Sequence, residues 1–259
     1  MTTEGSLVAA QRQEEIFRRA LARRVVRVKE LAVEYGVHEM TIRRDLDQLA
    51  DSGRLERIHG GARLSERTSE ELSHQLRAGQ NRPGKEAIAR EALRMLQPGN
   101  VIALDASTTC LALARMLGGL GVGAIVTSLD AAEALAEAGV PFTLAGGAFH
   151  PSSRSFVGTL VERTLERLNP DKAFFSAKGY TPATGFADPQ LPEVAVKSSL
   201  LRGAGAKIAL LDHTKFGRPA LARIAGTDEV DAVITDAEPE SVYRETFARN
   251  DVRLIIATP

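Results

Sequence analysis

The sequence predicts an α/β protein, with an N-terminal winged helix-turn-helix domain followed by a larger, mostly parallel α/β domain. Near the N-terminus, two amphipathic helical patterns flank Gly36, and a hairpin pattern around Gly60 and Gly61 follows them. Further along, short apolar runs alternate with amphipathic segments, as in a parallel sheet covered by helices on both faces. The expected parts are a winged domain at residues 1–65, a polar linker at 66–83 and the larger α/β domain at 84–259.

The overall charge does not mark the chain as a binder of polyanions. Of the 259 residues, 33 are basic and 33 are acidic, so the two charges cancel. The distribution is more informative, because residues 18–29 carry five arginines and a lysine without any acid. Phosphate contacts require a positive face rather than a positive chain. This run therefore suits DNA contact, although alone it would equally fit a solvated helix face.

Cysteine and histidine usage excludes several kinds of site. The single cysteine, Cys110, excludes an intrachain disulfide framework and fits a reducing compartment. We interpret it as a packing residue rather than a redox sensor. The five histidines lack metal-ligand spacing, so neither a metal nor a cofactor is expected. Because the chain shows no signal-peptide core and no apolar run of ~20 residues, we expect a cytoplasmic protein without a membrane segment.

Three helices and a hairpin make up the expected winged domain. The second helix should end at Gly36, since glycine readily adopts positive φ at a helix end. In the third helix, Ile42, Leu46 and Leu49 recur at i, i+4 and i+7 and should face inward. The expected bounds are 7–23, 28–35 and 38–52 for the helices and 55–59 and 62–64 for the strands.

The third helix has the chemistry of a DNA-recognition helix. Its exposed face carries hydroxyl and guanidinium groups, and arginine pairs bidentately with guanine. We expect Thr41 and Arg43 to read base edges, while Arg44 and the arginines of the hairpin hold phosphates. Asp45 should orient an arginine. The residues expected to contact DNA are His38, Thr41, Arg43, Arg44, Arg57, His59 and Arg63.

The remaining chain divides into a linker and a domain of alternating strands and helices. Residues 66–83 are rich in Ser, Glu, Gln and Arg, with a short helix predicted over 70–77. Strands are predicted at 101–104, 124–126, 142–145, 173–175, 208–211, 232–234 and 254–256. Helices are predicted at 85–96, 109–117, 130–138, 157–168, 193–201 and 238–248.

Polar or glycine-rich segments follow five of the predicted strands. In parallel sheets, ligands bind at the carboxyl ends of the strands, and a helix N-terminus there can hold an anion. Each segment alone is weak evidence for a binding site, but together the five segments predict one pocket for a small, hydroxylated, anionic ligand. The residues expected to bind this effector are Asp105, Ser107, Thr108, Thr109, Thr127, Ser128, Gly146, Gly147, Lys178, Gly179, Glu193, Lys197, Asp212 and Lys215. Lys85 could also reach a phosphate, or could simply be solvated.

The N-terminal motifs closely resemble those of the DeoR family of bacterial regulators. The matching segments are Glu30-Leu31-Ala32, Val37-His38, Thr-Ile-Arg-Arg-Asp-Leu at residues 41–46, and His-Gly-Gly-Ala at residues 59–62. The family usually has serine at the position of His38, and serine is the better N-cap for the recognition helix. Histidine should cap less well, or it could contact a phosphate or a base.

The later motifs are similar to the sensor domain of the same family. The family's Asp-Ser-Gly-Thr-Thr appears at residues 105–109 with Ala-Ser in the middle, and its Thr-Asn-Ser appears at residues 127–129 as Thr-Ser-Leu. The double glycine at residues 146–147, the spacing of Glu193 and Lys197, and Asp-x-x-Lys-Phe-Gly from residue 212 are all present. The resemblance implies a fold similar to ribose-5-phosphate isomerase and an effector that is a phosphorylated sugar or a related metabolite.

The leading interpretation is a transcriptional repressor of carbohydrate genes that binds double-stranded operator DNA and responds to a phosphorylated sugar. Two half-sites require two winged units, so a homodimer or homotetramer is expected. An alternative is a sugar-phosphate isomerase fused to a DNA-binding module, using Asp105, Asp212, Glu193 and Lys215 as acid, base and charge-stabilising groups. The chain lacks the doublet of carboxylates at one strand end that this chemistry favours, so we expect no enzymatic activity. A third alternative is an architectural DNA-binding protein whose pocket binds nothing.

Overall fold

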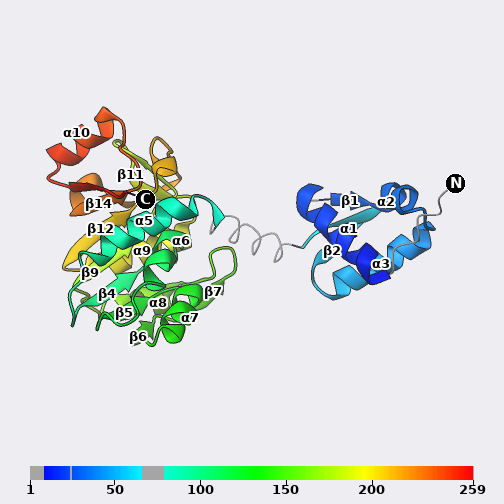
Figure 1. Cartoon of the computed structure of the whole chain (residues 1–259), viewed down its shortest axis with the longest axis horizontal. Helices are drawn as coiled ribbons and strands as arrows, with labels where there is room; N and C mark the ends of the chain where they lie inside the picture. Colours follow the sequence, from blue (N-terminus) through cyan, green and yellow to red (C-terminus); the bar gives the residue numbers. More distant parts are fainter. Residues whose placement is uncertain (1–8, 24, 66–78, 259) are drawn as a thin grey trace. The chain divides into compact units, whose positions relative to one another are not determined.

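The computed structural model describes residues 9–23, 25–65 and 79–258. The chain divides into two compact units, Met1–Gln75 and Leu76–Pro259 (Figure 1). The short helix predicted over residues 70–77, and most of the predicted linker, lie outside the described residues. Within the described ranges, every helix is too short or too polar to cross a membrane.

The first unit contains the helices and the hairpin that the sequence predicts, together with one strand that it does not. The helices are α1 (Ala9–Arg23), α2 (Val28–Tyr35) and α3 (Glu39–Asp51), and the strands are β1 (Val25–Arg27), β2 (Leu55–Ile58) and β3 (Gly61–Leu64). The unpredicted strand β1 pairs antiparallel with β3, which gives the order β1-β3-β2. A Cβ on Gly61 would lie 2.1 Å from the carbonyl oxygen of Val26, so glycine is required where these strands meet.

The core of this unit confirms the predicted helical periodicity. Ile42, Leu46 and Leu49 of α3 are at most 4% exposed and pack in one cluster with Ile16 of α1. Helix α2 ends at Gly36, whose φ of 63° is left-handed and whose N–H bonds back to the helix. Buried apolar faces of the three helices therefore fix α3 with its opposite face in solvent.

The second unit is built on a seven-stranded sheet in the order β15-β14-β12-β9-β4-β5-β6. Every neighbouring pair is parallel. The strands are β4 (Val101–Leu104), β5 (Gly123–Val126), β6 (Phe142–Leu144), β9 (Lys172–Phe175), β12 (Ala206–Leu210), β14 (Ala232–Thr235) and β15 (Arg253–Ile256). These are the strands predicted from the apolar runs, with small shifts at their ends, so the parallel α/β prediction is confirmed.

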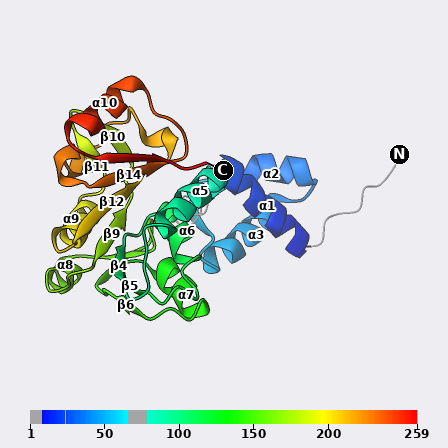
Figure 2. The ribbon, with the colours of Figure 1, turned by 60° about the vertical axis from the view of Figure 1, so that its left-hand side comes forward.

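Helices cover both faces of this sheet (Figure 2). They are α5 (Arg82–Leu93), α6 (Thr108–Ala114), α7 (Leu129–Glu137), α8 (Thr159–Leu165), α9 (Leu191–Arg202) and α10 (Ser241–Arg249). Alternate residues of each strand face opposite sides. Ile102 and Leu104 pack in the cluster with α5, α6 and α7, whereas Ala103 packs in the cluster with α8, α9 and α10.

The predicted helices of this unit begin one to three residues away from their observed starts, and two of these differences have a clear local cause. Helix α5 begins at Arg82, inside the predicted linker, because Pro83 fits the first helical turn rather than ending the preceding segment. The helix predicted over 157–168 is wrong at its start. Val157 ends strand β8, and α8 begins only after Gly158, whose φ is 96°.

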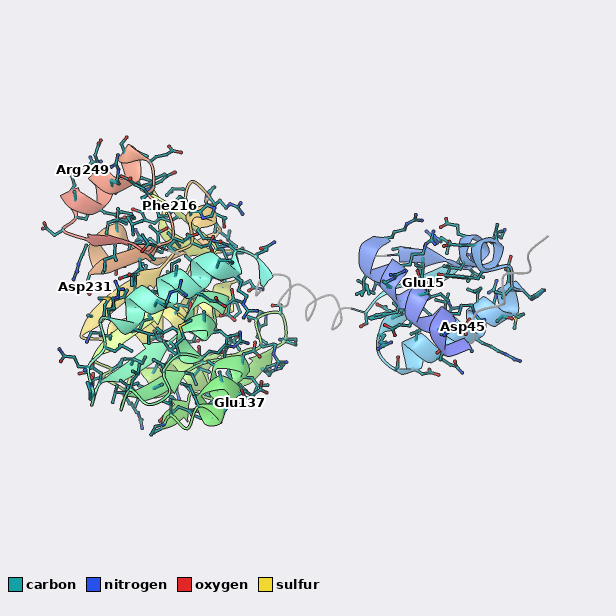
Figure 3. The ribbon with its side chains drawn as sticks, viewed as in Figure 1. Glu15, Asp45, Glu137, Phe216, Asp231 and Arg249 are labelled. Carbon is teal, nitrogen blue, oxygen red and sulfur yellow. The ribbon has the colours of Figure 1, made fainter. Side chains whose placement is uncertain are left out.

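The second unit also contains two smaller sheets that were not predicted. Strands β7 (Ala148–His150) and β8 (Ser155–Val157) form a hairpin, and β10 (Gly179–Thr181), β11 (Gly185–Asp188) and β13 (Ala222–Ala225) form an antiparallel sheet. An aromatic cluster holds this sheet against α10. The ring of Tyr180 stacks on Phe247 with centroids 5.1 Å apart and meets the edge of Phe216, labelled in Figure 3.

Candidate functional site

A cavity of about 330 Å³ lies where β4, β9 and β12 end. It is lined by side chains that the sequence predicted for effector binding, namely Ser107, Thr108, Thr109, Lys178, Glu193, Lys197, Asp212 and Lys215. Lys85 also lines it. Residues that sequence reasoning missed complete the lining, namely Gln80, Asn81, Ala106, Ser153, Ser176, Ala177, Asp188, Gln190, Thr214 and Arg218. The cavity therefore brings together ends of the parallel strands and residues from α5, α9 and the antiparallel sheet.

Lys197 is a buried cation of the cavity, as is Lys85, which is therefore not the solvated side chain of one sequence-based alternative. Its Nζ donates to the carbonyl oxygen of Ser176 at 3.0 Å and to Asp188 Oδ2 at 3.1 Å, and lies 3.4 Å from Asp105 Oδ2. Burial opposes the charge, but the carboxylates of Asp105, Asp188 and Glu193 outweigh it and raise the pKa of Lys197 above 10.5. The ammonium is therefore charged at neutral pH, and it binds two carboxylates that would otherwise repel each other.

Asp105 is a buried carboxylate next to the cavity lining, and its hydrogen bonds connect two strand ends. Its Oδ1 accepts the Ser107 N–H and its Oδ2 accepts the Ser176 N–H, both at 2.9 Å, and its side chain is only 1% exposed. These bonds connect the ends of β4 and β9. Asp105 is thus placed to hold the two strand ends and Lys197 together, while the lining itself begins at its neighbour Ala106.

The first turn of α6 contributes hydroxyls to the cavity. Ser107 is the N-cap, and its Oγ accepts the Cys110 N–H at 3.1 Å. Thr108 and Thr109 follow it in the first turn.

Cys110 is fully buried, its thiol donates to the Phe174 carbonyl oxygen, and burial raises its pKa, in agreement with a packing role.

Glu193 is a buried carboxylate that α9 contributes to the cavity lining. Its Oε1 accepts hydrogen bonds from Ser153 Oγ at 2.6 Å and Ser155 Oγ at 2.5 Å, and His150 Nδ1 lies 3.4 Å away. The two serines belong to the β7–β8 hairpin, so a carboxylate on α9 fixes that hairpin beside the cavity. Sequence spacing identified Glu193 but gave no indication of its serine partners.

The cationic side chains of the lining outnumber the carboxylates. The cations are Lys85, Lys178, Lys197, Lys215 and Arg218, and the acids are Asp188, Glu193 and Asp212. The five cations still outnumber the carboxylates when the buried Asp105 next to the lining is counted as a fourth acid. Asp212 caps the short 3₁₀ helix η1 (His213–Lys215), and Lys215 Nζ lies 3.7 Å from its carboxylate. The cavity thus favours an anion, and its hydroxyl and amide groups suit a ligand that carries hydroxyls.

The start of α5 is fixed at the rim of the cavity. Asn81 adopts a left-handed conformation, with φ of 49°, and its Nδ2 donates to Asp236 Oδ2 at 2.8 Å. The backbone N–H of His213 donates to Asp236 Oδ1 at 2.7 Å. Burial opposes ionisation of Asp236, but these hydrogen bonds prevail and lower its pKa. One carboxylate therefore joins the start of α5 to the loop that carries Asp212 and Lys215.

Several residues predicted for the effector site do not line this cavity, and the structure places most of them in backbone roles nearby. Ser128 Oγ caps α7 by accepting the Ala131 N–H, and the Thr127 carbonyl oxygen accepts the Phe156 N–H. A Cβ on Gly147 would lie 2.7 Å from the Val157 carbonyl oxygen, and one on Gly179 would lie 2.0 Å from that of Arg218, so these two glycines permit close backbone approach between segments. A Cβ on Gly146 would meet no atom within 4 Å, so the structure gives that glycine no such role.

The residues predicted to contact DNA lie on α3 and on the wing formed by β2 and β3. Arg43 and Arg44 are exposed, Thr41 is half-buried, and Arg43 pairs with Glu39 at 3.2 Å. On the wing, Arg57 pairs with Asp47 at 2.9 Å, Arg63 pairs with Glu56 at 2.8 Å, and the His59 carbonyl oxygen accepts from Arg27. Such exposed pairs contribute little stability, so a phosphate can replace the carboxylate.

His38 has a structural role that the sequence only partly indicated. It is the N-cap of α3, and its Nδ1 accepts the Met40 N–H at 3.2 Å. The expected weakening of this helix end is thus offset by the imidazole itself. Across the described parts of the chain, acids, histidines and the cysteine form no group capable of holding a metal ion.

Comparison with known proteins covers both units. Residues 12–68 match the DeoR-like helix-turn-helix domain, and residues 80–237 match the DeoR C terminal sensor domain. The transcriptional regulator GolR of Listeria innocua is 34% identical, with 92% of this chain and 94% of that protein covered. The L-fucose operon activator of Escherichia coli is 31% identical, with 88% and 95% covered. Ribose 5-phosphate isomerase A of Methanocaldococcus jannaschii is 21% identical, with a TM-score of 0.40 and 53% and 55% covered.

Proposed function

Because the chain belongs to the DeoR family of helix-turn-helix transcriptional regulators, we propose that a phosphorylated sugar or a closely related metabolite binds its cavity and controls its affinity for operator DNA. The observation that carries the proposal is the excess of cationic side chains in a cavity that also presents hydroxyls. A phosphate would sit near Lys215, Lys178 and the hydroxyls at the start of α6, since these side chains line the same cavity. The sugar hydroxyls would meet Gln190 and the side of Glu193 that lines the cavity, while Glu193 Oε1 stays bound to the two serines.

Control of DNA binding follows if the ligand prefers one arrangement of the protein over another. A metabolite changes DNA affinity only by as much as its own affinity differs between the two arrangements. The rim residues Gln80 and Asn81 lie at the end of the sensor unit from which the chain leads to the winged unit. Ligand contact at this rim would therefore act close to the connection between the two units.

The proposal includes a homo-oligomer that acts on DNA in the cytoplasm. Two winged units read two half-sites, as the two-fold symmetry of helix-turn-helix operators requires. One relative is named an operon activator, so this architecture serves activation in at least that protein. The proposal therefore concerns control by a metabolite. Reporter expression measured with and without the metabolite shows whether the protein activates or represses transcription.

The proposal treats the sensor unit as a binding domain rather than as an isomerase. Asp105 accepts two backbone N–H groups, Asp188 binds Lys197, and Glu193 accepts two serine hydroxyls. These carboxylates are committed to the scaffold rather than aimed at a substrate proton. Incubation of the protein with ribose 5-phosphate, followed by nuclear magnetic resonance, tests this point, and product formation at enzymatic rates would contradict it.

A thermal-shift assay on the full chain tests the ligand class. Each phosphorylated sugar of a panel is compared with its unphosphorylated parent on the wild type, Lys215→Met and Lys207→Met. Lys207 lies at the other end of β12 and serves as the matched control. We expect stabilisation by at least one phosphorylated sugar but not by its parent, and its loss in Lys215→Met alone. Equal stabilisation by a phosphorylated sugar and by its unphosphorylated parent would contradict the proposal that the cavity binds an anion.

A further inference from the structure

The corner between α2 and α3 carries an apolar surface that the winged unit does not use in its own core. Val33 is 84% exposed and Met40 is 54% exposed, although both residues are large and apolar. They line one hollow with Ala32, Val37, His38, Glu39 and Arg43. On α3, Ile42, Leu46 and Leu49 are instead buried in the core of the unit.

The same hollow lies on the cationic face of α3. Met40, Arg43 and Arg44 are spaced i, i+3 and i+4, which places them on one side of the helix. Both arginines are exposed, and the acid of the hollow, Glu39, pairs with Arg43 at 3.2 Å. An apolar protein segment would have to cover guanidinium groups here, whereas DNA brings phosphates that suit them.

We propose that Met40, supported by Val33, reads thymine in the operator through contact with its C5-methyl group. The first residues of a recognition helix are the ones that meet base edges in the major groove. There, the methyl group of thymine is the apolar feature that distinguishes one base from another. A methionine suits this role because its unbranched, polarisable side chain adapts to the position of the methyl group. This proposal rests on the DNA binding described above.

Deoxyuridine scanning provides the test, because deoxyuridine differs from thymidine only by the missing methyl group. Duplexes are first enriched from a random library with the full-length wild-type protein, and each thymine is then replaced in turn. The variants are Met40→Ala, Met40→Leu, which retains an apolar side chain, and Val25→Ala. Val25 is an exposed apolar residue of the same unit that does not line the hollow and serves as the matched control.

At one or two thymines per half-site, we expect replacement to weaken wild-type binding about fourfold, the effect of one buried methyl group. Met40→Leu and Val25→Ala should show the same loss, and Met40→Ala should show none. The proposal is overturned if no thymine matters, or if Met40→Ala remains as sensitive as the wild type. It is also overturned if Met40→Ala dissociates the oligomer while methyl sensitivity is retained, since the hollow would then join two copies. Failure to enrich any duplex would instead refute DNA binding itself.

Discussion

Arg12 and Asp45, 33 positions apart, form a buried bidentate ion pair between α1 and α3. Arg12 Nε donates to Asp45 Oδ2 at 2.6 Å, and Nη2 donates to Oδ1 at 3.2 Å. The two side chains are 7% and 4% exposed, and Asp45, labelled in Figure 3, also accepts from Gln13 at 3.1 Å. Asp45 orients an arginine, as the sequence predicted, and that arginine is Arg12 of α1.

This pair should be sensitive to the loss of one partner. Asp45→Ala leaves a buried guanidinium without its carboxylate, and we expect it to lower the free energy of unfolding by about 3–5 kcal/mol. The exposed pair of Glu56 and Arg63 gives the matched control, because Glu56→Ala should cost at most about 1 kcal/mol. Urea unfolding followed by circular dichroism measures both. Equal, small losses in the two variants would contradict the structural role assigned to Asp45.

The cap at His38 leads to a prediction about the start of the recognition helix. Removing the imidazole acceptor in His38→Ala should destabilise the unit by about 1 kcal/mol, since the Met40 N–H loses its partner. His38→Ser should retain or exceed the wild-type stability, because serine is a stronger N-cap. Calorimetric unfolding of the three proteins separates these cases. The cap assignment fails if the serine variant is as unstable as the alanine variant.

Arg43 and Arg44 should have separable effects on DNA. Arg43→Ala is expected to lose about 1–3 kcal/mol of discrimination between the preferred and a substituted operator, because bidentate pairing with guanine disappears. Arg44→Ala should weaken binding to all sequences alike and should lower the salt dependence. Binding titrations of both variants on matched duplexes at several salt concentrations provide the measurement. A uniform loss for Arg43→Ala would assign it to phosphate contact instead.

The raised pKa of Lys197 leads to a prediction about how the stability of the protein depends on pH. Its pKa is raised above 10.5, so the stability it contributes is complete below that pH and is lost only as the pH rises beyond it. Lys197→Met leaves Asp105 and Asp188 buried without their cation, at an expected cost of about 3–5 kcal/mol near neutral pH.

The difference in the free energy of unfolding between wild type and Lys197→Met should therefore stay constant between about pH 7 and about pH 9, and should decrease only as the pH rises through the raised pKa of Lys197. Urea unfolding across this range and above it measures the difference, with Lys207→Met as the control. A difference that already disappears between about pH 7 and about pH 9 would contradict the ion-pair account.

The parallel sheet and the three N-terminal helices could be predicted because their signals are local. Runs such as Val101–Leu104 are continuously apolar and bounded by polar turns, and Gly36 marks a helix end within one short segment. Strands β7, β8, β10, β11 and β13 have three or four residues each, too few for a clear alternating pattern. Their existence depends on pairing between distant segments.

The candidate site was predicted where it depends on strand ends and missed where it depends on long-range packing. Ser107, Asp212 and Lys215 follow predicted strands, so their convergence could be anticipated. Asp188 reaches Lys197 only because β11 pairs within a sheet that the sequence did not indicate. Asn81 reaches the rim because Asp236, 155 positions away, accepts its side-chain N–H.

Fluorescence anisotropy of the full-length protein on an enriched duplex, titrated with paired phosphorylated and unphosphorylated sugars, tests metabolite control most directly. The account predicts that at least one phosphorylated sugar changes the Kd for DNA by about fivefold or more, that its parent sugar does not, and that Lys215→Met abolishes the response while still binding DNA. An unchanged Kd with every phosphorylated sugar, or the same change with the parent sugar, would contradict it.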